Sequence, residues 1–450
     1  MSQVSEQTSR STHVSPARAA VLPHLEAKAR RFPELFPDPM DVSRLSPRDA
    51  RLATTIDREV TARWSTLRAI LEPRLNQPWN QQQPAVLAAL MGGAAQLLFM
   101  DRVPDHAAIG ESVGWCKSTA AARASGVVNA VLRRVAGLRA ELLERVDMNN
   151  PAHLLRSDGT GWRLSEPIFD GTLQHHVAQQ TGCNDAFLEE IARTDGPEEA
   201  MRLALHAMAR PPVILHGAGE HDALEAHESP GFQVLRPGSS LADVFEQYPD
   251  AIVQDPTAAA ACAATSATAP QCIVDVCAGR GTKTRQLAAI HTSARIIASD
   301  ISPGRMLGLH DLADTHQQIE ACPAKELIRH AGTVDLLVLD VPCSNSGVLA
   351  RRVEARHRQD PATRRRLGEL QRQIAADSLA LLAPGGTLLW TTCSIHADEN
   401  ERQVEWLTKW HDLELALMHR ELGRGAPGEP AMKWRDGGFF ALLRKPASND

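Results

Sequence analysis

Residues Asp335–Gly347 read DLLVLDVPCSNSG, and residues Gly385–Ser394 read GGTLLWTTCS. Each segment carries a short apolar run, Leu336–Leu339 in the first and Thr387–Thr391 in the second, bounded by Gly, Pro and polar residues. Short apolar runs with such boundaries are typical of strands buried in a parallel sheet. The two segments therefore predict an α/β fold for the second half of the chain.

A cysteine follows each predicted strand, Cys343 after the first and Cys393 after the second. Ligands of open α/β sheets bind beyond the carboxyl ends of the strands, so both thiols are expected at the ligand-binding edge. They would face each other if the two strands are neighbours. Free cysteines are among the most buried residues, so two ordinary core thiols are the alternative. Two cysteines at equivalent strand ends, with Asp340 and Pro342 beside the first, favour covalent chemistry on a ligand.

The overall composition is that of a soluble globular protein with more than one domain. The 450 residues exceed the length at which a single core stops growing, and 43% of them are hydrophobic. The net charge of −6 restricts any nucleic-acid site to a local basic patch. The eight cysteines show no CxxC pair and no zinc-ligand spacing, so no disulfide framework and no metal site are expected. Without a long apolar run or a signal peptide, we expect a cytoplasmic monomer that does not contact a membrane.

The first part of the chain has a helical pattern. Ser46 followed by Pro47 is typical of a helix start, Pro84 opens a second helix, and a third is expected from Gly126 through residue 146. No strand pattern intervenes. We therefore expect four regions: a disordered tail at 1–18, a helical domain at 19–147, a linker subdomain at 148–236, and an α/β domain at 237–450.

Residues 272–290, CIVDVCAGRGTKTRQLAAI, form a strand–loop–helix pattern with glycines in the loop and the helix starting near Lys283. Glycines permit a tight turn, and a helix N-terminus favours a negatively charged group. The next strand, RIIASD, ends at Asp300, nineteen residues after Gly281. An acid at this place suits the two hydroxyls of a ribose. The pattern predicts a site for a nucleoside-bearing cofactor, with S-adenosylmethionine the leading candidate.

Several of these segments resemble one known family. RDARLATTIDREVTARWSTL and GGAAQLLFMDRVPDHA look like the NusB-type RNA-binding domain that is fused to RsmB/Sun-type RNA cytosine-C5 methyltransferases. DVCAGRGTKT resembles the cofactor loop of that family, DVPCSNSG its D-x-P-C-S motif, and TTCS its T-C-S motif. DGGFFALLRK resembles its closing strand. The resemblance implies a Rossmann-like methyltransferase domain behind an all-α NusB-like domain.

The resemblance also implies roles for single residues. Cys393 would be the nucleophile, Cys343 would help to release the product, and Asp340 would lie between the cofactor and the target base. The cofactor-binding residues would be Cys277, Ala278, Gly279, Arg280, Gly281, Thr282, Lys283, Asp300 and Asp340. The chain departs from the family at three places: Arg280 stands where the family has Pro, Thr282 where it has Gly, and Pro323 where an acid near the adenine is expected.

Two basic segments are candidates for RNA contacts. Arg133 and Arg134 lie in the third predicted helix, and a run of eight arginines against three acids begins at Arg351 and Arg352 and ends at Arg372. Either segment could instead be a solvated face, which is the usual fate of charged runs. Because the second adjoins the Cys343 loop in an acidic protein, we expect it to bind an RNA backbone and to favour the thiolate form of the cysteines.

These expectations combine into one functional hypothesis, methylation of carbon 5 of a cytosine in ribosomal RNA through a covalent cysteine adduct. Two alternatives remain. An RNA-binding ribosome assembly factor with a vestigial methyltransferase domain would explain the altered cofactor loop. The same chemistry on transfer RNA would use the same residues.

Overall fold

The computed structural model describes residues 14–447, and the chain forms two compact units. The first unit contains the residues up to Met208 together with Arg356–Arg358, and the second contains 209–355 and the residues from Gln359 onward. The predicted disordered tail lies outside the described residues as far as position 13. Its last part is helical, because helix α1 (Pro16–Arg31) begins within it.

The first unit is built around a helix bundle, as the sequence predicts. Ser46 caps α2 by accepting a hydrogen bond from the backbone N–H of Asp49 (3.1 Å). Helix α4 is buried along its whole length after Pro84 and lies at the centre of the bundle. The helices of this part are α2 (Pro47–Ala62), α3 (Trp64–Leu71), α4 (Pro84–Phe99), α5 (Asp105–Lys117) and α6 (Ser125–Ala136).

The prediction of one continuous helix from Gly126 to residue 146 was wrong. Helix α6 ends at Ala136, and the chain continues as β1 (Arg139–Leu143), which pairs with β3 (Gly161–Leu164) and, through it, with β2 (His153–Leu155). The reason is tertiary: Arg139 donates to Leu97 O (3.0 Å) and forms an ion pair with Asp105. These contacts, made beyond a helix-breaking Gly137, outweigh the helical pattern of the sequence.

Three further helices complete the first unit, α7 (Leu173–Thr181), α8 (Asp185–Thr194) and α9 (Pro197–Met208). The division between the units therefore falls inside the segment predicted as a linker, 148–236. The remainder of that segment contributes to a small four-stranded sheet of the second unit, with the order β5 (Leu224–Ala226), β6 (Phe232–Leu235), β4 (Ile214–His216) and β7 (Ile252–Val253). Helix α10 (Leu241–Gln247) lies between β6 and β7 in the chain.

A seven-stranded sheet forms the core of the second unit. Its first five strands in spatial order are parallel, and the sixth pairs antiparallel with both the fifth and the seventh. The order is β10 (Ile319–Ala321), β9 (Arg295–Ala298), β8 (Cys272–Asp275), β11 (Val334–Asp340), β12 (Leu382–Thr392), β14 (Gly438–Arg444) and β13 (Glu414–Glu421). The chain order reverses between β8 and β11, and such a switch point is where doubly wound sheets bind ligands.

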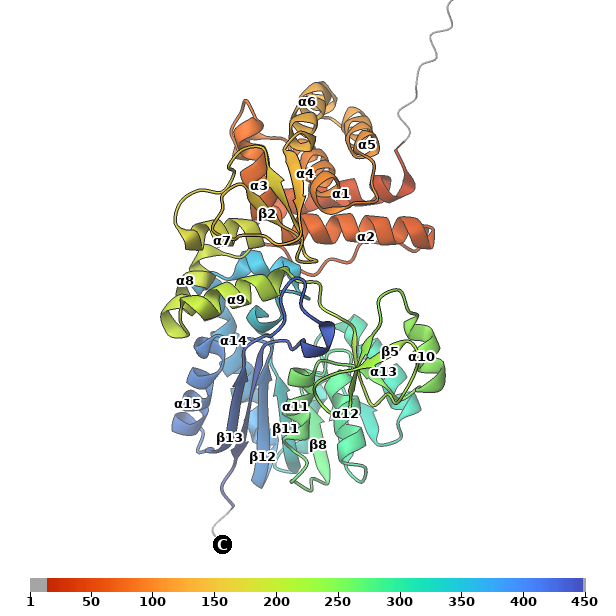
Figure 1. Ribbon diagram of the computed structural model, residues 1–450. Coiled ribbons are helices and arrows are strands. Elements are labelled where there is room, and N and C mark those ends of the chain that lie inside the picture. The colour runs from red at the N-terminus through yellow and green to blue at the C-terminus, as the bar shows by residue number, and fades with distance from the viewer. Residues whose placement is uncertain (1–13, 448–450) are drawn as a thin grey trace, which may run out of the picture. The chain divides into compact units, whose positions relative to one another are not determined.

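Helices cover both faces of this sheet, as the ribbon in Figure 1 shows. One apolar core joins the sheet to α11 (Pro256–Ala263), α12 (Thr282–Ile290) and α13 (Pro303–Thr315), and the other joins it to α14 (Pro361–Ser378) and α15 (Glu401–Trp410). Helix α14 stops at Ser378, and residues Pro384–Gly386 belong to β12.

The structure confirms that the two cysteine-bearing strands are neighbours. Strand β11 pairs in parallel with β12, with Asp340 opposite Thr391. The carboxyl ends of both strands, and of β8 and β9, therefore lie at one edge of the sheet. Among residues 14–447, no helix combines the length and the apolar character needed to cross a membrane.

Candidate active site

The thiols of Cys343 and Cys393 meet at the carboxyl edge of the sheet. Their sulfur atoms are 3.1 Å apart, and both side chains are partly exposed. Asn345 lies beside them, with its Oδ1 atom 3.2 Å from Cys393 Sγ. Asn345 has a φ of 61°, a left-handed conformation that asparagine adopts more readily than most residues. The turn after Cys343 thus brings a polar side chain back to the second sulfur.

The contact between the sulfurs affects the ionisation of Cys343. The hydrogen bond to Cys393 is the main cause that raises the pKa of Cys343 well above that of a free thiol, and burial adds to it. A thiol with a raised pKa keeps its proton at neutral pH. The 3.1 Å contact, in which either sulfur could be the donor, allows the two thiols to share a proton.

A half-buried ion pair lies close to the sulfurs. Lys283 Nζ, from the first turn of α12, is 2.7 Å from Asp340 Oδ2 at the end of β11. Burial by itself would lower the pKa of Lys283, but the Asp340 carboxylate outweighs it and holds that pKa above its usual value. Lys283 also interacts electrostatically with Cys393. An ammonium group that stays charged in this place favours a nearby thiolate.

The loop from Cys277 to Lys283 connects β8 to α12 at the same edge. Gly279 and Gly281 have φ values of 61° and 78°, and a Cβ atom on Gly281 would lie 2.5 Å from Leu312 Cδ2. Asp300 follows β9, and its carboxylate accepts from Gly279 N (3.1 Å) and Ser302 N (2.8 Å). Glycine is required at Gly281 because a side chain there would be strained and would overlap Leu312.

This loop fits the cofactor that the sequence predicts. Asp300 Oδ1 accepts only the N–H of Ser302 and retains a lone pair for a ribose hydroxyl, whereas Oδ2 accepts from both Gly279 N and Arg305 Nη1 (3.2 Å). Space beside Gly279 is open, because no atom lies within 4 Å of a Cβ built there. The departures from the family loop do not fill this space: Arg280 is exposed and Thr282 is the first residue of α12. Burial raises the pKa of Cys277 to about 12, which makes that thiol unsuitable as a nucleophile.

The arginine run that begins at Arg351 is not an open basic surface. Arg351 forms an ion pair with Asp436 (2.5 Å) and donates to Pro212 O (3.0 Å). Arg356 is buried in the first unit, where it donates to Ala62 O and Thr181 O, and burial lowers its pKa to about 10. The fold thus pairs or buries part of the run, while Arg352, Arg365, Arg366 and Arg372 are exposed, and RNA binding by the run stays a prediction. Lys283 is a cation close to the cysteines.

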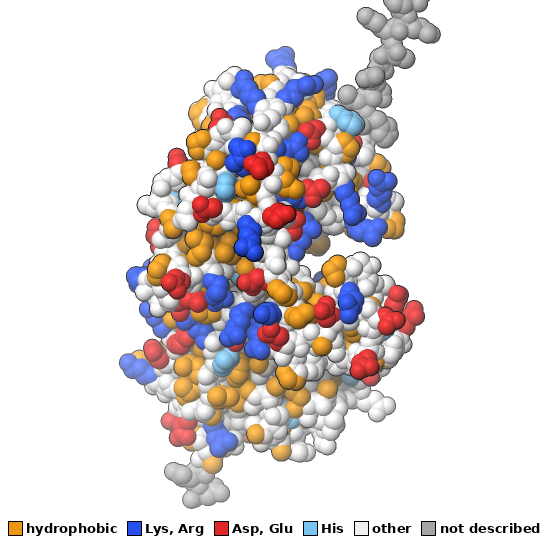
Figure 2. All heavy atoms as spheres, viewed as in Figure 1, with side chains coloured by type: hydrophobic (Ala, Val, Ile, Leu, Met, Phe, Trp, Pro, Cys, Tyr) orange, Lys and Arg blue, Asp and Glu red, His pale blue; other side chains and the backbone are white. Residues whose placement is uncertain are grey.

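Arg133 and Arg134 are both exposed near the end of α6. Arg133 contacts Asn129 through a 3.3 Å hydrogen bond. On the face of the molecule in Figure 2, basic side chains alternate with acidic ones and form no single large patch. An RNA contact on this face would thus depend on small groups of basic side chains.

Sequence reasoning missed the residues that hold the cysteine loops. Glu399 and Gln371 are completely buried and bind the residues next to the cysteines. Glu399 stands in the polar run ADENE, which in sequence looks like an exposed turn. No spacing rule marks it, because its partner Ser344 is 55 residues away. Among the residues that the structure describes, no group of three or more His, Cys, Asp or Glu side chains could hold a metal ion.

Comparisons with known proteins agree with this geometry. The sequence model of the family "16S rRNA methyltransferase RsmB/F" matches residues 264–443, and that of the NusB family matches residues 24–137. MT1451 of Mycobacterium tuberculosis is 30% identical over 407 residues, which cover 86% of this chain and 85% of the relative. Ribosomal RNA small subunit methyltransferase B of Pasteurella multocida is 27% identical over 85% of each chain.

A solved structure shares the fold of nearly the whole chain. The crystal structure of PH0851 superimposes with a TM-score of 0.70 at 18% sequence identity and covers 96% of this chain and 100% of its own. S-adenosylmethionine is the methyl donor of this group of enzymes, and the loop and Asp300 are suited to hold it. Taken with the paired sulfurs and the helical N-terminal unit, these matches show that the chain belongs to the RsmB/F family of 16S rRNA methyltransferases and carries a NusB-family domain.

Proposed function

We propose that the protein transfers a methyl group from S-adenosylmethionine to carbon 5 of a cytosine in small-subunit ribosomal RNA, through a covalent adduct with Cys393. The observation that carries the proposal is the 3.1 Å contact between Cys343 and Cys393 beside the Lys283–Asp340 ion pair. The names of relatives such as ribosomal RNA small subunit methyltransferase B support the choice of substrate.

Carbon 5 of cytosine is a weak nucleophile, so the ring has to be activated. The Cys393 thiolate adds to carbon 6, a sulfur–carbon bond forms, and the electron pair of the 5,6 double bond becomes available at carbon 5. Bound S-adenosylmethionine supplies an electrophilic methyl group on a positively charged sulfur. Transfer of the methyl group to carbon 5 would break its bond to that sulfur and leave S-adenosylhomocysteine. Carbon 5 then gives its proton to Cys343, the bond between Cys393 and carbon 6 breaks, the double bond returns, and the Cys393 thiolate is released.

Cys343 is placed to accept the proton from carbon 5. While Cys393 is free, the hydrogen bond between the two thiols is the largest cause of the raised pKa of Cys343. Once Cys393 is bonded to the base, it is a neutral thioether, and that cause is removed. Cys343 is partly exposed, so it can then give its own proton to water and act as the base for product release. Formation of the adduct would thus lower the pKa of Cys343 and allow it to act as a base.

Asp340 and Lys283 are placed to stabilise the activated ring. Asp340 can accept a hydrogen bond from the exocyclic amine or from a protonated ring nitrogen, and Lys283 balances its charge. The base has to leave its stack to reach the sulfurs, so a looped or single-stranded RNA segment is the expected substrate.

Two variants and a matched control test the proposal. Cys393→Ala should abolish methyl transfer, while Cys343→Ala should accumulate a protein–RNA adduct that survives a denaturing gel. Cys116→Ala, which alters a buried cysteine of α5, should behave like the wild type. Normal turnover of Cys343→Ala without an adduct would refute the roles.

The substrate and the cofactor need separate measurements. Bisulfite mapping of cellular RNA with and without the gene should reveal a lost 5-methylcytosine in small-subunit ribosomal RNA, whereas a loss confined to transfer RNA would refute the substrate. Titration calorimetry should detect binding of S-adenosylmethionine to the isolated protein. Absence of binding would instead support an RNA-binding assembly factor.

A further inference from the structure

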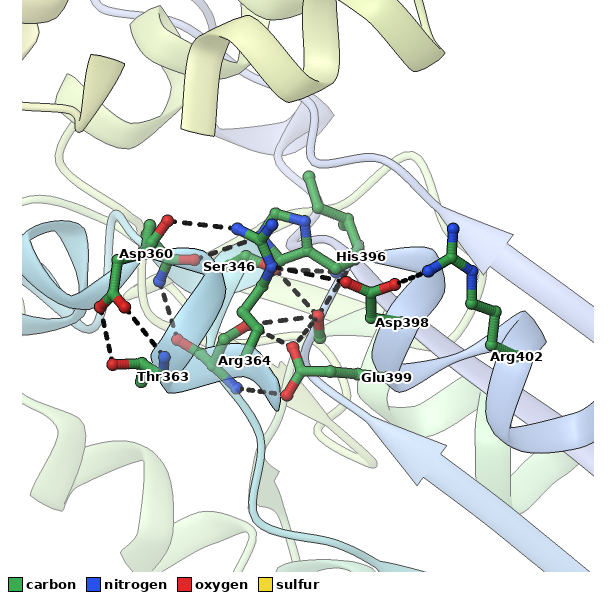
Figure 3. A network of polar contacts seen from close by, with 12 residues as sticks. Ser346, Asp360, Thr363, Arg364, His396, Asp398, Glu399 and Arg402 are labelled. Carbon is green, nitrogen blue, oxygen red and sulfur yellow. Dashed lines mark hydrogen bonds and ion pairs between the residues drawn. The ribbon is translucent and has the colours of Figure 1, made fainter. Parts of the chain in front are cut away.

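A single buried carboxylate binds both cysteine loops. Glu399, in the turn before α15, has no exposed surface. Its Oε1 atom accepts from Ser344 N (2.9 Å) and Gln371 Nε2 (3.0 Å), and its Oε2 atom accepts from Ser344 Oγ (2.5 Å) and Ser394 Oγ (2.6 Å). Figure 3 shows Glu399 pointing into this network beside Ser346 and His396.

The two serines connect the carboxylate to the thiols. Ser344 directly follows Cys343, and Ser394 directly follows Cys393. Further bonds join the loops in the same layer: Ser346 Oγ lies 3.0 Å from Ser394 Oγ, and Gly347 N donates to Cys393 O (2.9 Å). The position of each sulfur is thus coupled, through one peptide unit, to the same two oxygen atoms.

We propose that Glu399 is a positioning residue that holds the two cysteine loops together, so that the thiols of Cys343 and Cys393 stay within reach of one proton and one pyrimidine ring. The expected effect of Glu399 on methyl transfer rests on the proposed function, whereas its effect on the distance between the two sulfurs is independent of that function. Glu399 does not touch the reacting atoms, and it acts through Ser344 and Ser394.

Electrostatics explain why a carboxylate occupies this position. Burying a charge is costly unless several donors compensate it, and here four hydrogen bonds are donated to the two oxygens. A glutamine offers only one acceptor atom. An amide NH2 in place of Oε2 would face the Ser344 and Ser394 hydroxyls, which donate to Glu399. Ser394 Oγ already lies 3.1 Å from His396 N and 3.0 Å from Ser346 Oγ. The isosteric amide is therefore expected to loosen at least one of the two loops.

The negative charge has a second effect on the pair. After the Cys393 hydrogen bond and burial, Glu399 is a further cause that raises the pKa of Cys343. It thereby favours the state in which Cys343 holds the shared proton. Position and protonation of the pair thus both depend on this carboxylate.

Oxidation by diamide measures the thiol geometry without RNA or methyl donor. The two thiols lose two hydrogen atoms to diamide and form a disulfide, and peptide mapping identifies the Cys343–Cys393 link. Wild-type protein should form this link rapidly, because the sulfurs are already in contact. Glu399→Gln should form it about tenfold more slowly or worse, since a shift of about 1 Å is enough to lose such proximity.

Asp398→Asn provides the matched control. Asp398 lies in the same turn, but its carboxylate pairs with Arg402 and, at 3.9 Å, with Arg364, and it makes no hydrogen bond to either cysteine loop. This variant should oxidise at the wild-type rate. Ser394→Ala removes only one hydroxyl and guards against a folding defect of Glu399→Gln. It should also slow the oxidation while its melting temperature stays close to that of the wild type.

The kinetics of methyl transfer provide a second, independent test. If the proposed function holds, Glu399→Gln should lower kcat about tenfold or more and leave KM for RNA almost unchanged, because misplacement affects the reacting geometry and not RNA binding. Folded Glu399→Gln and Ser394→Ala proteins that oxidise at the wild-type rate would overturn the positioning role. A slowed oxidation in a protein that methylates no RNA would uphold the positioning role and refute the proposed function alone.

Discussion

Asp275, the last residue of β8, is a carboxyl group whose folded-state pKa is far from its usual value. It is completely enclosed, Thr284 Oγ1 donates to its Oδ2 atom (2.8 Å), and its Oδ1 atom has no hydrogen-bond partner among the described residues. Burial raises the pKa of Asp275 to about 7. The folded protein therefore keeps a proton on Asp275 at pH values at which the unfolded chain has lost it.

This shift predicts that Asp275 makes the protein less stable as the pH rises. Below about pH 4 the group is protonated in both states and costs nothing, and between about pH 4 and 7 only the unfolded state ionises, so the free energy of unfolding falls. Asp275→Asn cannot ionise. Relative to the wild type, it should gain on the order of 1–3 kcal/mol between pH 5 and pH 8, measured by urea unfolding. A difference that does not vary with pH would contradict the assignment.

Single residues were predictable from sequence only where a motif and a strand end coincide. Cys343, Cys393 and Asp340 adjoin apolar runs, so both their place and their chemistry could be predicted. The pairing of Lys283 with Asp340 could not, because it joins residues 57 positions apart. The role of Glu399 could not be predicted either, because only the tertiary fold shows that this charged turn is buried.

The elements of the second unit followed their sequence signals closely. The predicted strands 336–339 and 387–391 lie inside β11 and β12, and the helix expected near Lys283 is α12. The errors arose where tertiary contacts overrode local pattern. Residues 139–143 form a strand because they pair with β3. The arginine run contains buried side chains such as Arg356, because backbone carbonyls at the ends of α2 and α7 accept hydrogen bonds from that side chain.

The close contact between the Cys343 loop and the start of β14 predicts the effect of a single methyl group. A Cβ on Gly347 would lie 2.5 Å from the carbonyl of Gly437, and the backbones of these two glycines are hydrogen-bonded (2.8 Å). Gly347→Ala should destabilise the protein by about 1–3 kcal/mol, because neither backbone can yield easily. It should also slow methyl transfer, since Gly347 N binds Cys393 O.

Gly308→Ala is the control for this prediction. Gly308 lies in α13 with no atom within 4 Å of a Cβ placed there, so alanine should stabilise the helix by about 0.5–1 kcal/mol. Thermal unfolding of both variants measures the contrast. An unchanged melting temperature for Gly347→Ala would mean that the loop and β14 separate at little cost.

For the molecule as a whole, the net charge of −6 opposes association with RNA. The organisation into a helical domain followed by an α/β domain was predictable from the sequence, and the NusB match over residues 24–137 agrees with it. The site of RNA binding was harder to predict, because a run of arginines in the sequence does not reveal which of their side chains are buried or paired in the folded protein. Exposed arginines on the helical unit remain the natural candidates.

Arg133 and Arg134 should therefore contribute to RNA binding through phosphate contacts. The double variant Arg133→Ala/Arg134→Ala should weaken binding and reduce the slope of log K against log salt concentration by about 1–2, because each phosphate contact releases close to one counterion. KM for RNA should rise while kcat stays near the wild-type value, since the cysteine site is untouched. The matched control is Arg295→Ala/Arg329→Ala, whose side chains pair with Glu320. Equal salt slopes for the two double variants would remove Arg133 and Arg134 from the RNA interface.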